Sequence, residues 1–175
     1  MIKDRIIQSK GDKRKYFISV FIGTGIFITF IESLFPRPLP FLRLGLGNIV
    51  IVAGLGVFSL KELILIQIFR LFLAGILRGT LLGLPFFLGL IGGIASILGM
   101  YVCYKFFYKF FSLIGICVLG ALISNSSQLL ASLYFFPVQV VRFLVPVVIL
   151  IALITGSITG IISQYFYKKV LLYSG

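Results

Sequence analysis

Six long apolar runs dominate this sequence and constrain its fold more than any other feature. They cover approximately residues 16–35, 44–60, 62–79, 81–104, 110–135 and 143–167. A helix needs about 20 predominantly apolar residues to cross a bilayer. Only 11% of the 175 residues are charged, whereas soluble domains carry about 25%. The sequence therefore predicts an all-α integral membrane protein built as a bundle of six transmembrane helices.

The positions of Lys and Arg predict the orientation of this bundle. With the N-terminus in the cytoplasm, eleven of the 16 basic residues lie inside, four lie outside, and Arg70 falls within the third run. Cytoplasmic loops carry an excess of Lys and Arg, so we expect an N-in, C-in arrangement in the bacterial inner membrane. Residues 1–15 form a basic cytoplasmic tail near anionic lipid, and residues 16–175 a single membrane domain. The net charge of +12 thus reflects topology and not nucleic-acid binding.

Polar side chains inside apolar runs are costly and indicate a functional site. In the third run, Gln67 and Arg70 share one helical face. Glu32, on one face with Gly25 and Thr29, lies near the outer end of the first run and can reach Arg70. Two interpretations stay open. Arg70 and Glu32 form a structural ion pair, or Arg70 holds an anionic group of a substrate with Glu32 as its partner.

The fifth run carries a second polar face. Ala121, Asn125, Gln128 and Ser132 lie within about 60° of arc on an ideal helix. Hydrogen bonding between helices is one explanation, and a ligand-binding face is the one we favour. The residues expected to bind substrate are polar side chains within or beside the apolar runs: Arg70, Asn125, Gln128, Asn48 and Glu32.

The segment "LFPRPLPFLRLGLGN", residues 34–48, interrupts the apolar pattern. Its alternating prolines favour an extended path, and Gly45 and Gly47 allow the backbone to bend or to approach other groups closely. We expect a lid over an outward-facing pocket, although a rigid connector would have the same prolines. The lid residues would be Arg37, Arg43, Pro38 and Pro40.

The remaining composition argues against an enzyme. The chain has no His and four acidic residues, and both aspartates, Asp4 and Asp12, lie in the basic tail. Hard cations need oxygen ligands, so we expect no metal site, and we expect no cofactor. Cys103 and Cys117 lack metal-ligand spacing and are expected to be free and buried. The small-residue spacing in 89–93 and 156–160 predicts close helix packing.

Four blocks carry a family resemblance: "ESLFPRPLPFLRLGLGNI", "RLFLAGILRG", "GLIGGIASILGM" and "GALISNSSQLLA". Together they resemble the Gx transporter family, also named heptaprenyl diphosphate synthase component I, over roughly residues 30–135. In the last block the family usually has a histidine where this chain has Ser124. The family is similar to the six-helix, substrate-binding S components of energy-coupling factor transporters. The resemblance implies a bundle of that kind, with its pocket near the outer face under the first loop.

The resemblance also implies a function and partners. We expect a non-enzymatic subunit that takes up a small, anionic or vitamin-like solute with a transmembrane coupling subunit and ATPases. By resemblance the coupling subunit would dock on small residues of the first helix, which here are Ser19, Gly23 and Gly25. One alternative is a redox subunit that relays electrons from quinone to extracytoplasmic flavin, with a bound flavin or quinone. Another is a non-catalytic membrane partner of a prenyl diphosphate synthase.

Overall fold

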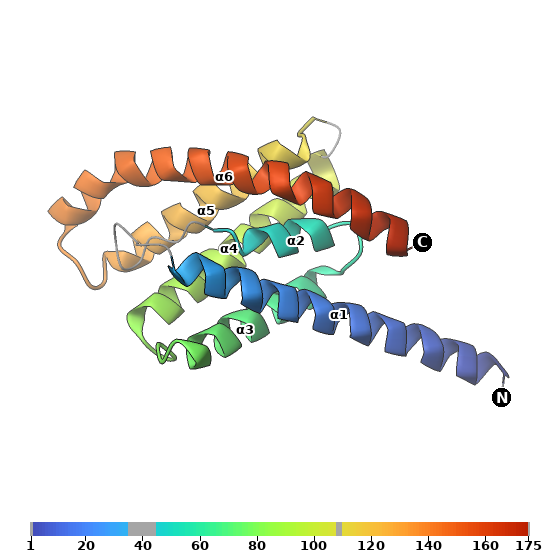
Figure 1. Ribbon diagram of the computed structural model, residues 1–175. Helices are drawn as coiled ribbons and strands as arrows, with labels where there is room; N and C mark the ends of the chain where they lie inside the picture. Colours follow the sequence, from blue (N-terminus) through green and yellow to red (C-terminus); the bar gives the residue numbers. More distant parts are fainter. Residues whose placement is uncertain (1, 35–44, 108–109, 175) are drawn as a thin grey trace.

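The computed structural model describes residues 2–34, 45–107 and 110–174, and the secondary structure in these ranges is helical. The helices run back and forth along one bundle (Figure 1). Their bounds are α1 Ile2–Leu34, α2 Asn48–Gly54, α3 Leu60–Leu77, α4 Leu84–Phe107, α5 Leu113–Ser132 and α6 Val138–Ser174. The all-helical fold is thus confirmed, and α1 shows that the basic segment at its start is helical too.

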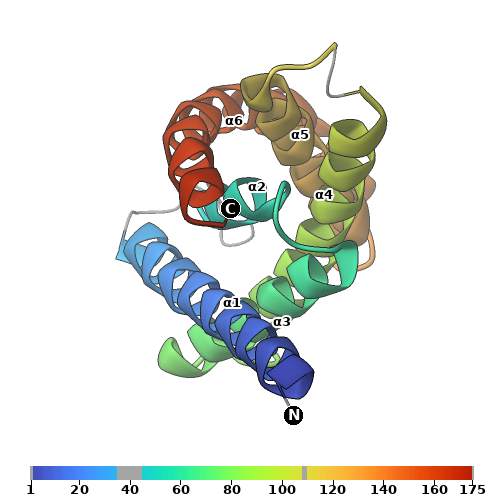
Figure 2. The same ribbon diagram turned by 90° about the vertical axis from the view of Figure 1, so that its right-hand side faces the viewer.

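Five helices form a ring around the sixth. Viewed along the bundle, α1, α3, α4, α5 and α6 surround the short helix α2 (Figure 2). Neighbouring helices of the ring pack in the order α1, α3, α4, α5 and α6, and α2 packs against α6, α3 and α5 from within. The main core lies where α1, α2 and α3 meet α4 and α5, and it includes Ile51, Leu63, Ile97 and Ile116.

The second apolar run forms only a short helix, so the prediction of six membrane-spanning helices is not confirmed, although the chain does pass through the bundle here. Helix α2 has 7 residues, and a helix of that length rises only about 10 Å. All of its residues are buried, so the run is apolar because it packs against protein and not because it faces lipid. Irregular backbone is tolerated at membrane depth where protein surrounds it.

The sequence around α3 explains where that helix begins and ends. The Glu62 carboxylate accepts hydrogen bonds from the backbone N–H and the hydroxyl of Ser59, each 2.8 Å long, which stabilises the first turn. Gly79 follows the last turn with φ +64°. There the N–H groups of Gly79 and Thr80 donate to the carbonyls of Ile76 and Gly75, and glycine adopts this left-handed conformation without strain. Helix α3 is therefore delimited by local chemistry at both ends.

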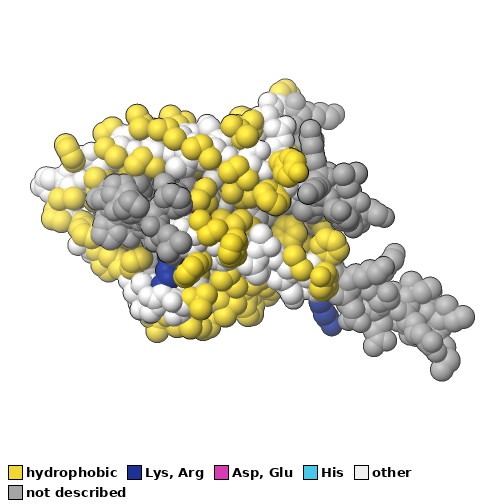
Figure 3. All heavy atoms as spheres, in the orientation of Figure 1, with side chains coloured by type: hydrophobic (Ala, Val, Ile, Leu, Met, Phe, Trp, Pro, Cys, Tyr) yellow, Lys and Arg dark blue, Asp and Glu magenta, His cyan; other side chains and the backbone are white. Residues whose placement is uncertain are grey.

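The outer surface of the bundle is apolar. Figure 3 shows hydrophobic side chains over most of the described face, with isolated basic groups among them. Four helices are long and apolar enough to cross a membrane, over Lys15–Glu32, Leu84–Phe107, Leu113–Ser132 and Val138–Tyr167. Helix α3 has 18 residues and exposes Leu65, Phe69 and Phe72 outward. These features are those of an integral membrane protein.

Glycines bring α5 and α6 into close contact. A Cβ on Gly156 would lie 2.7 Å from the Val118 Cα, and one on Gly160 would lie 2.8 Å from the Ile114 Cα. Backbone atoms cannot move aside as a side chain can, so these two positions require glycine. The predicted close packing of the 156–160 segment is confirmed, and so are the free, buried states of Cys103 and Cys117.

Both described chain ends lie at the same end of the bundle, as Figure 2 shows. Helix α1 runs from that end to the opposite one, and α3 begins again near the termini (Figure 1). The chain between them therefore returns through the centre of the ring, partly as α2. This path places the start of α2 beside the C-terminal end of α1, where the polar residues of the site gather.

Candidate functional site

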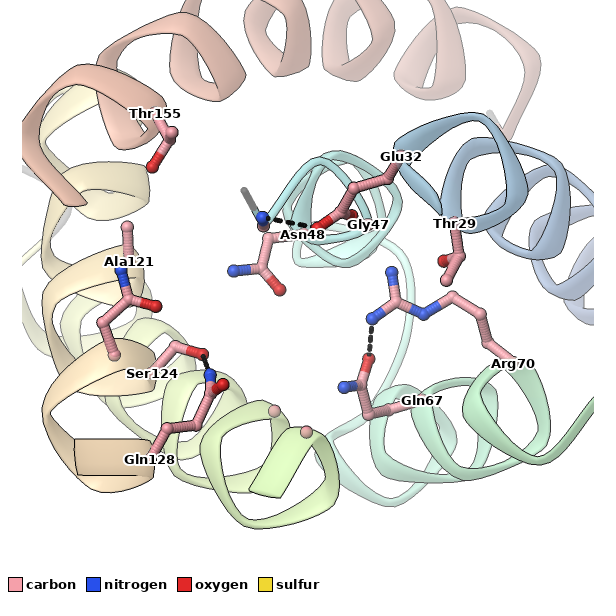
Figure 4. Close-up of a pocket in the computed structure, with 14 residues that line it drawn as sticks. Thr29, Glu32, Gly47, Asn48, Gln67, Arg70, Ala121, Ser124, Gln128 and Thr155 are labelled. Atoms are coloured by element: carbon pink, nitrogen blue, oxygen red, sulfur yellow. Dashed lines mark hydrogen bonds between the residues drawn. The ribbon is translucent and has the colours of Figure 1, made fainter. Parts of the chain in front are cut away.

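A small polar cavity lies inside the ring, and residues from all six helices line it (Figure 4). Its volume is about 30 Å³, which suits about two water molecules. The lining residues are polar or small: Thr29, Glu32, Gly45, Gly47, Asn48, Gln67, Arg70, Gly89, Gly93, Ala121, Ser124, Asn125, Gln128 and Thr155. The cavity is far smaller than a typical ligand pocket of about 300 Å³ or more.

Arg70 is the only charged group that α3 contributes to this cavity, and its side chain is 4% exposed. Its Nη2 donates a hydrogen bond of 2.6 Å to the Gln67 Oε1. The Nε and Nη1 atoms are buried and have no hydrogen-bond partner. Figure 4 shows the guanidinium end directed toward the centre of the cavity. A buried cation with unsatisfied donors is costly, and an anion in the cavity would remove much of that cost.

Two glycines make room for this arginine. A Cβ on Gly25 of α1 would lie 2.7 Å from the Arg70 Cδ. A Cβ on Gly47, just before α2, would overlap the Arg70 Nη1 and lie 2.5 Å from Cζ. The Arg70 side chain therefore lies directly against two backbones. Gly47 has φ −62°, so this position needs glycine for space and not for conformation.

Glu32 fixes the turn before α2. Its Oε1 accepts a hydrogen bond of 3.1 Å from the Gly45 N–H, and Gly45 has φ +77°. The described structure contains no Arg70–Glu32 ion pair within 4.0 Å, so the expectation that Glu32 is the ion-pair partner of Arg70 is wrong. The carboxylate instead contacts the backbone turn through its Oε1. The negative charge of Glu32 still favours the charged form of Arg70, whereas the positive charge of Arg78 disfavours it.

The wall opposite Arg70 consists of α5 and the glycines of α4. The Gln128 Nε2 donates to the Ser124 Oγ over 3.1 Å, while the Gln128 Oε1 is buried without a partner. A Cβ on Gly92 would lie 2.6 Å from the Gln128 Nε2, and one on Gly93 would overlap the Gln67 amide. The α4 glycines thus accommodate the amide side chains of both neighbouring helices.

The structure brings the five predicted substrate-binding residues together. All of them line the one cavity: Arg70, Asn125, Gln128, Asn48 and Glu32. Whether they bind a substrate stays a prediction. The predicted lid residues lie outside the described residues: Arg37, Arg43, Pro38 and Pro40.

The predicted docking face on α1 is only partly exposed. Ser19 and Gly23 are exposed, and a Cβ on Gly23 would meet nothing within 4 Å. Gly25 is buried against the Arg70 side chain. Gly25 is on the face of α1 that carries Thr29 and Glu32, and docking on this helix stays a prediction, for which Ser19 and Gly23 are the accessible residues.

Several cavity residues were not among the predicted site residues. The bond between Gln67 and Arg70 follows an i, i+3 spacing, which could have indicated it from the sequence. The predicted close approach at Gly47 is confirmed, but no local signal identifies the group that approaches it, which is a side chain 23 positions away. Thr155 comes from α6, and its hydroxyl donates to the Ile151 carbonyl at 2.8 Å, so it resembles an ordinary helical threonine until the fold places it at the cavity.

The chemistry available here is binding. Within the described ranges, no group of three or more His, Cys, Asp or Glu side chains could hold a metal ion. The cavity combines one guanidinium with free donors, one carboxylate, and amides from α2, α3 and α5. This arrangement can bind an anion through Arg70 and orient its remaining atoms through the amides.

A family model described as heptaprenyl diphosphate synthase component I matches residues 21–166. The match covers the C-terminal part of α1, all of α2 to α5, most of α6, and every residue that lines the cavity. No match to a curated protein was found, and no match to a solved structure was found.

Proposed function

This chain belongs to the heptaprenyl diphosphate synthase component I family, and we propose that it is a non-catalytic membrane subunit that binds a small anionic solute for uptake. The observation that carries this proposal is the environment of Arg70. Its guanidinium is buried, its Nε and Nη1 lack partners, and two glycines hold it against the backbone. A membrane protein retains such a group where it serves a site.

The sequence supports the non-catalytic part of the proposal. Making a prenyl diphosphate needs a site that holds diphosphate and its Mg²⁺ with several carboxylates. This chain has four acidic residues in total. Of these, Glu32 accepts a hydrogen bond from the Gly45 N–H, and Glu62 accepts one from the Ser59 N–H at the start of α3. Among the residues that the structure describes, no group of three or more His, Cys, Asp or Glu could hold a metal ion.

We further propose that this subunit resembles an energy-coupling factor S component and works with a transmembrane coupling subunit and ATPases. The exposed side of α1 around Ser19 and Gly23 supports docking of another helix, because small residues allow close approach. The site lies toward the end of the bundle opposite the termini. With both termini in the cytoplasm, that end would face outward.

Topology can be tested by cysteine labelling with a membrane-impermeant reagent. In a background of Cys103→Ser and Cys117→Ala, single cysteines would replace Tyr134 and Phe110, which are 94% and 84% exposed. They lie at opposite ends of α5. We expect Tyr134→Cys to label from outside intact cells and Phe110→Cys to label only after lysis. The reverse pattern would contradict an outward-facing site.

Anion binding can be tested by native mass spectrometry of the protein purified in mild detergent. We expect a small anion to copurify with the natural protein and to be lost from Arg70→Ala. Arg70→Lys is the matched control, since it keeps the charge but loses the planar fork that grips an oxyanion, and we expect weak retention. Copurification of the same anion with the Arg70→Ala protein would refute the proposal. Visible absorption by a bound flavin would instead support a redox subunit.

A second function is favoured by the family description, which names a component of a synthase. In that case the chain would be the membrane partner of a soluble prenyl diphosphate synthase. Copurification of an Asp-rich soluble synthase with the tagged chain would support this function. The Arg70 site would then serve to recognise an anionic group at the membrane.

A further inference from the structure

We infer that the cavity takes a compact monocarboxylate that carries a hydroxyl or amino group at its other end. This inference rests on the proposed anion-binding function and names the substrate class of the same site. It depends on two buried polar groups without partners. One is the Arg70 guanidinium of α3, and the other is the Gln128 amide oxygen of α5.

The shape of the Arg70 donors favours a carboxylate. Nη2 donates to Gln67, and Nη1 beside it has no partner. In Figure 4 the edge that carries both nitrogens is directed toward the cavity. Each of these nitrogens has two hydrogens, so Nη2 can donate to Gln67 and still present one to a ligand. Two parallel N–H groups match the two oxygens of a flat carboxylate.

The charge of the site favours a single negative charge on the ligand. The Arg70 charge is balanced in part by Glu32, which acts on it favourably. Arg78 adds a further positive charge nearby, and its Nη2 donates to the Thr29 carbonyl over 3.1 Å. The three groups together carry one net positive charge. A dianion such as phosphate would leave uncompensated charge in a buried site, at a large cost.

The walls around the charged groups favour a small ligand. The cavity has a volume of about 30 Å³, so its walls must move apart to admit either a hydroxy acid or phosphate, and the more compact anions are favoured. Glycines surround the guanidinium and the amides so closely that added Cβ atoms at 47, 92 and 93 would overlap or nearly touch them. The walls are therefore tight around the position where the charged end of the ligand would bind.

The opposite wall specifies the other end of the ligand. The Gln128 Oε1 is an acceptor without a donor, while its Nε2 is held by Ser124. An unsatisfied buried acceptor selects a ligand that brings a donor, because a ligand without one leaves the acceptor unpaired. Figure 4 shows α5 across the cavity from Arg70. A hydroxyl or amino group distal to the carboxylate would meet it there.

Isothermal titration calorimetry on the full chain in detergent micelles can test this inference. The probes are matched pairs of increasing length: acetate and glycolate, propionate and 3-hydroxypropionate, butyrate and 4-hydroxybutyrate. Inorganic phosphate is the comparison anion. We expect the carboxylates to bind more tightly than phosphate. We also expect the hydroxy acid of at least one pair to bind about tenfold more tightly than its partner, as one additional buried hydrogen bond implies.

Two variants assign these effects to residues. Gln128→Met keeps the size of the side chain but removes the acceptor, so we expect the ratio of the two affinities within each pair to fall to about one. Arg70→Lys should lower the affinity for every carboxylate by about tenfold or more. The comparisons on the natural protein remain decisive if either variant fails to fold.

The outcomes separate this inference from the function on which it rests. Arg70-dependent binding of phosphate in preference to every carboxylate would overturn the substrate class but leave anion binding intact. Equal affinities within all three pairs would overturn the role of Gln128. Failure of every anion to bind would overturn both the substrate class and the proposed function.

Discussion

Gly47→Ala tests the packing at the centre of the site. The backbone conformation predicts that this substitution stabilises the protein, whereas the surrounding atoms predict that it destabilises it. Gly47 has φ −62° and ψ −18°, which alanine adopts readily. On that ground alone the substitution should stabilise the protein by about 0.4–1 kcal/mol. The new Cβ, however, would overlap the Arg70 Nη1 and lie 2.9 Å from Nη2. Arg70 must therefore move.

The expected cost follows from what Arg70 loses when it moves. Overpacking in a dense interior costs about 1–3 kcal/mol. Breaking the hydrogen bond from the Arg70 Nη2 to Gln67, which involves a charged group, costs about 1.5–3 kcal/mol more. After subtracting the backbone gain, we expect the free energy of unfolding to fall by about 2–5 kcal/mol. Binding of the anion should weaken as well, because the guanidinium no longer faces the cavity.

The assay is reversible unfolding in detergent, followed by circular dichroism, with two controls. Gly23→Ala adds a methyl to α1 where nothing lies within 4 Å, so it should raise stability by up to about 1 kcal/mol. Gly47→Ala in an Arg70→Ala background should be neutral or stabilising, because the overlapping atoms are gone. A Gly47→Ala protein as stable as the natural one, with unchanged binding, would refute this account of the site.

Three further substitutions test other contacts. Gly156→Ala should lower the free energy of unfolding by about 1–3 kcal/mol, since its Cβ would lie 2.7 Å from the Val118 Cα; an unchanged melting temperature would contradict the close approach of α5 and α6. Tyr104→Phe removes the 2.7 Å hydrogen bond to the Tyr167 hydroxyl and should cost about 1 kcal/mol in the same assay. Gly23→Leu should leave the melting temperature near that of the natural protein but prevent copurification of a membrane partner. An intact complex with Gly23→Leu would indicate another docking face.

The sequence by itself determined the class of the fold and five of the residues that line the cavity. Repeated apolar runs that are long enough to cross a bilayer permit little except helices there. Polar residues inside such runs are too costly to face lipid, so helical periodicity alone placed Arg70, Asn125 and Gln128 toward the interior. Each of these side chains is buried at the cavity. This reasoning needs only the cost of burying polar groups in hydrocarbon and the geometry of a single helix.

The tertiary structure decided what each of these residues contacts. Apolar composition does not distinguish a segment that faces lipid from one that faces protein, so 44–60 resembled a crossing although α2 is a short, enclosed helix. Charge complementarity suggested that Glu32 would pair with Arg70, but the Glu32 carboxylate accepts a hydrogen bond from the Gly45 N–H. Gly25 resembled an exposed docking residue until α3 brought Arg70 against it. Contacts between distant segments depend on how whole helices pack, and no local pattern in the chain encodes them.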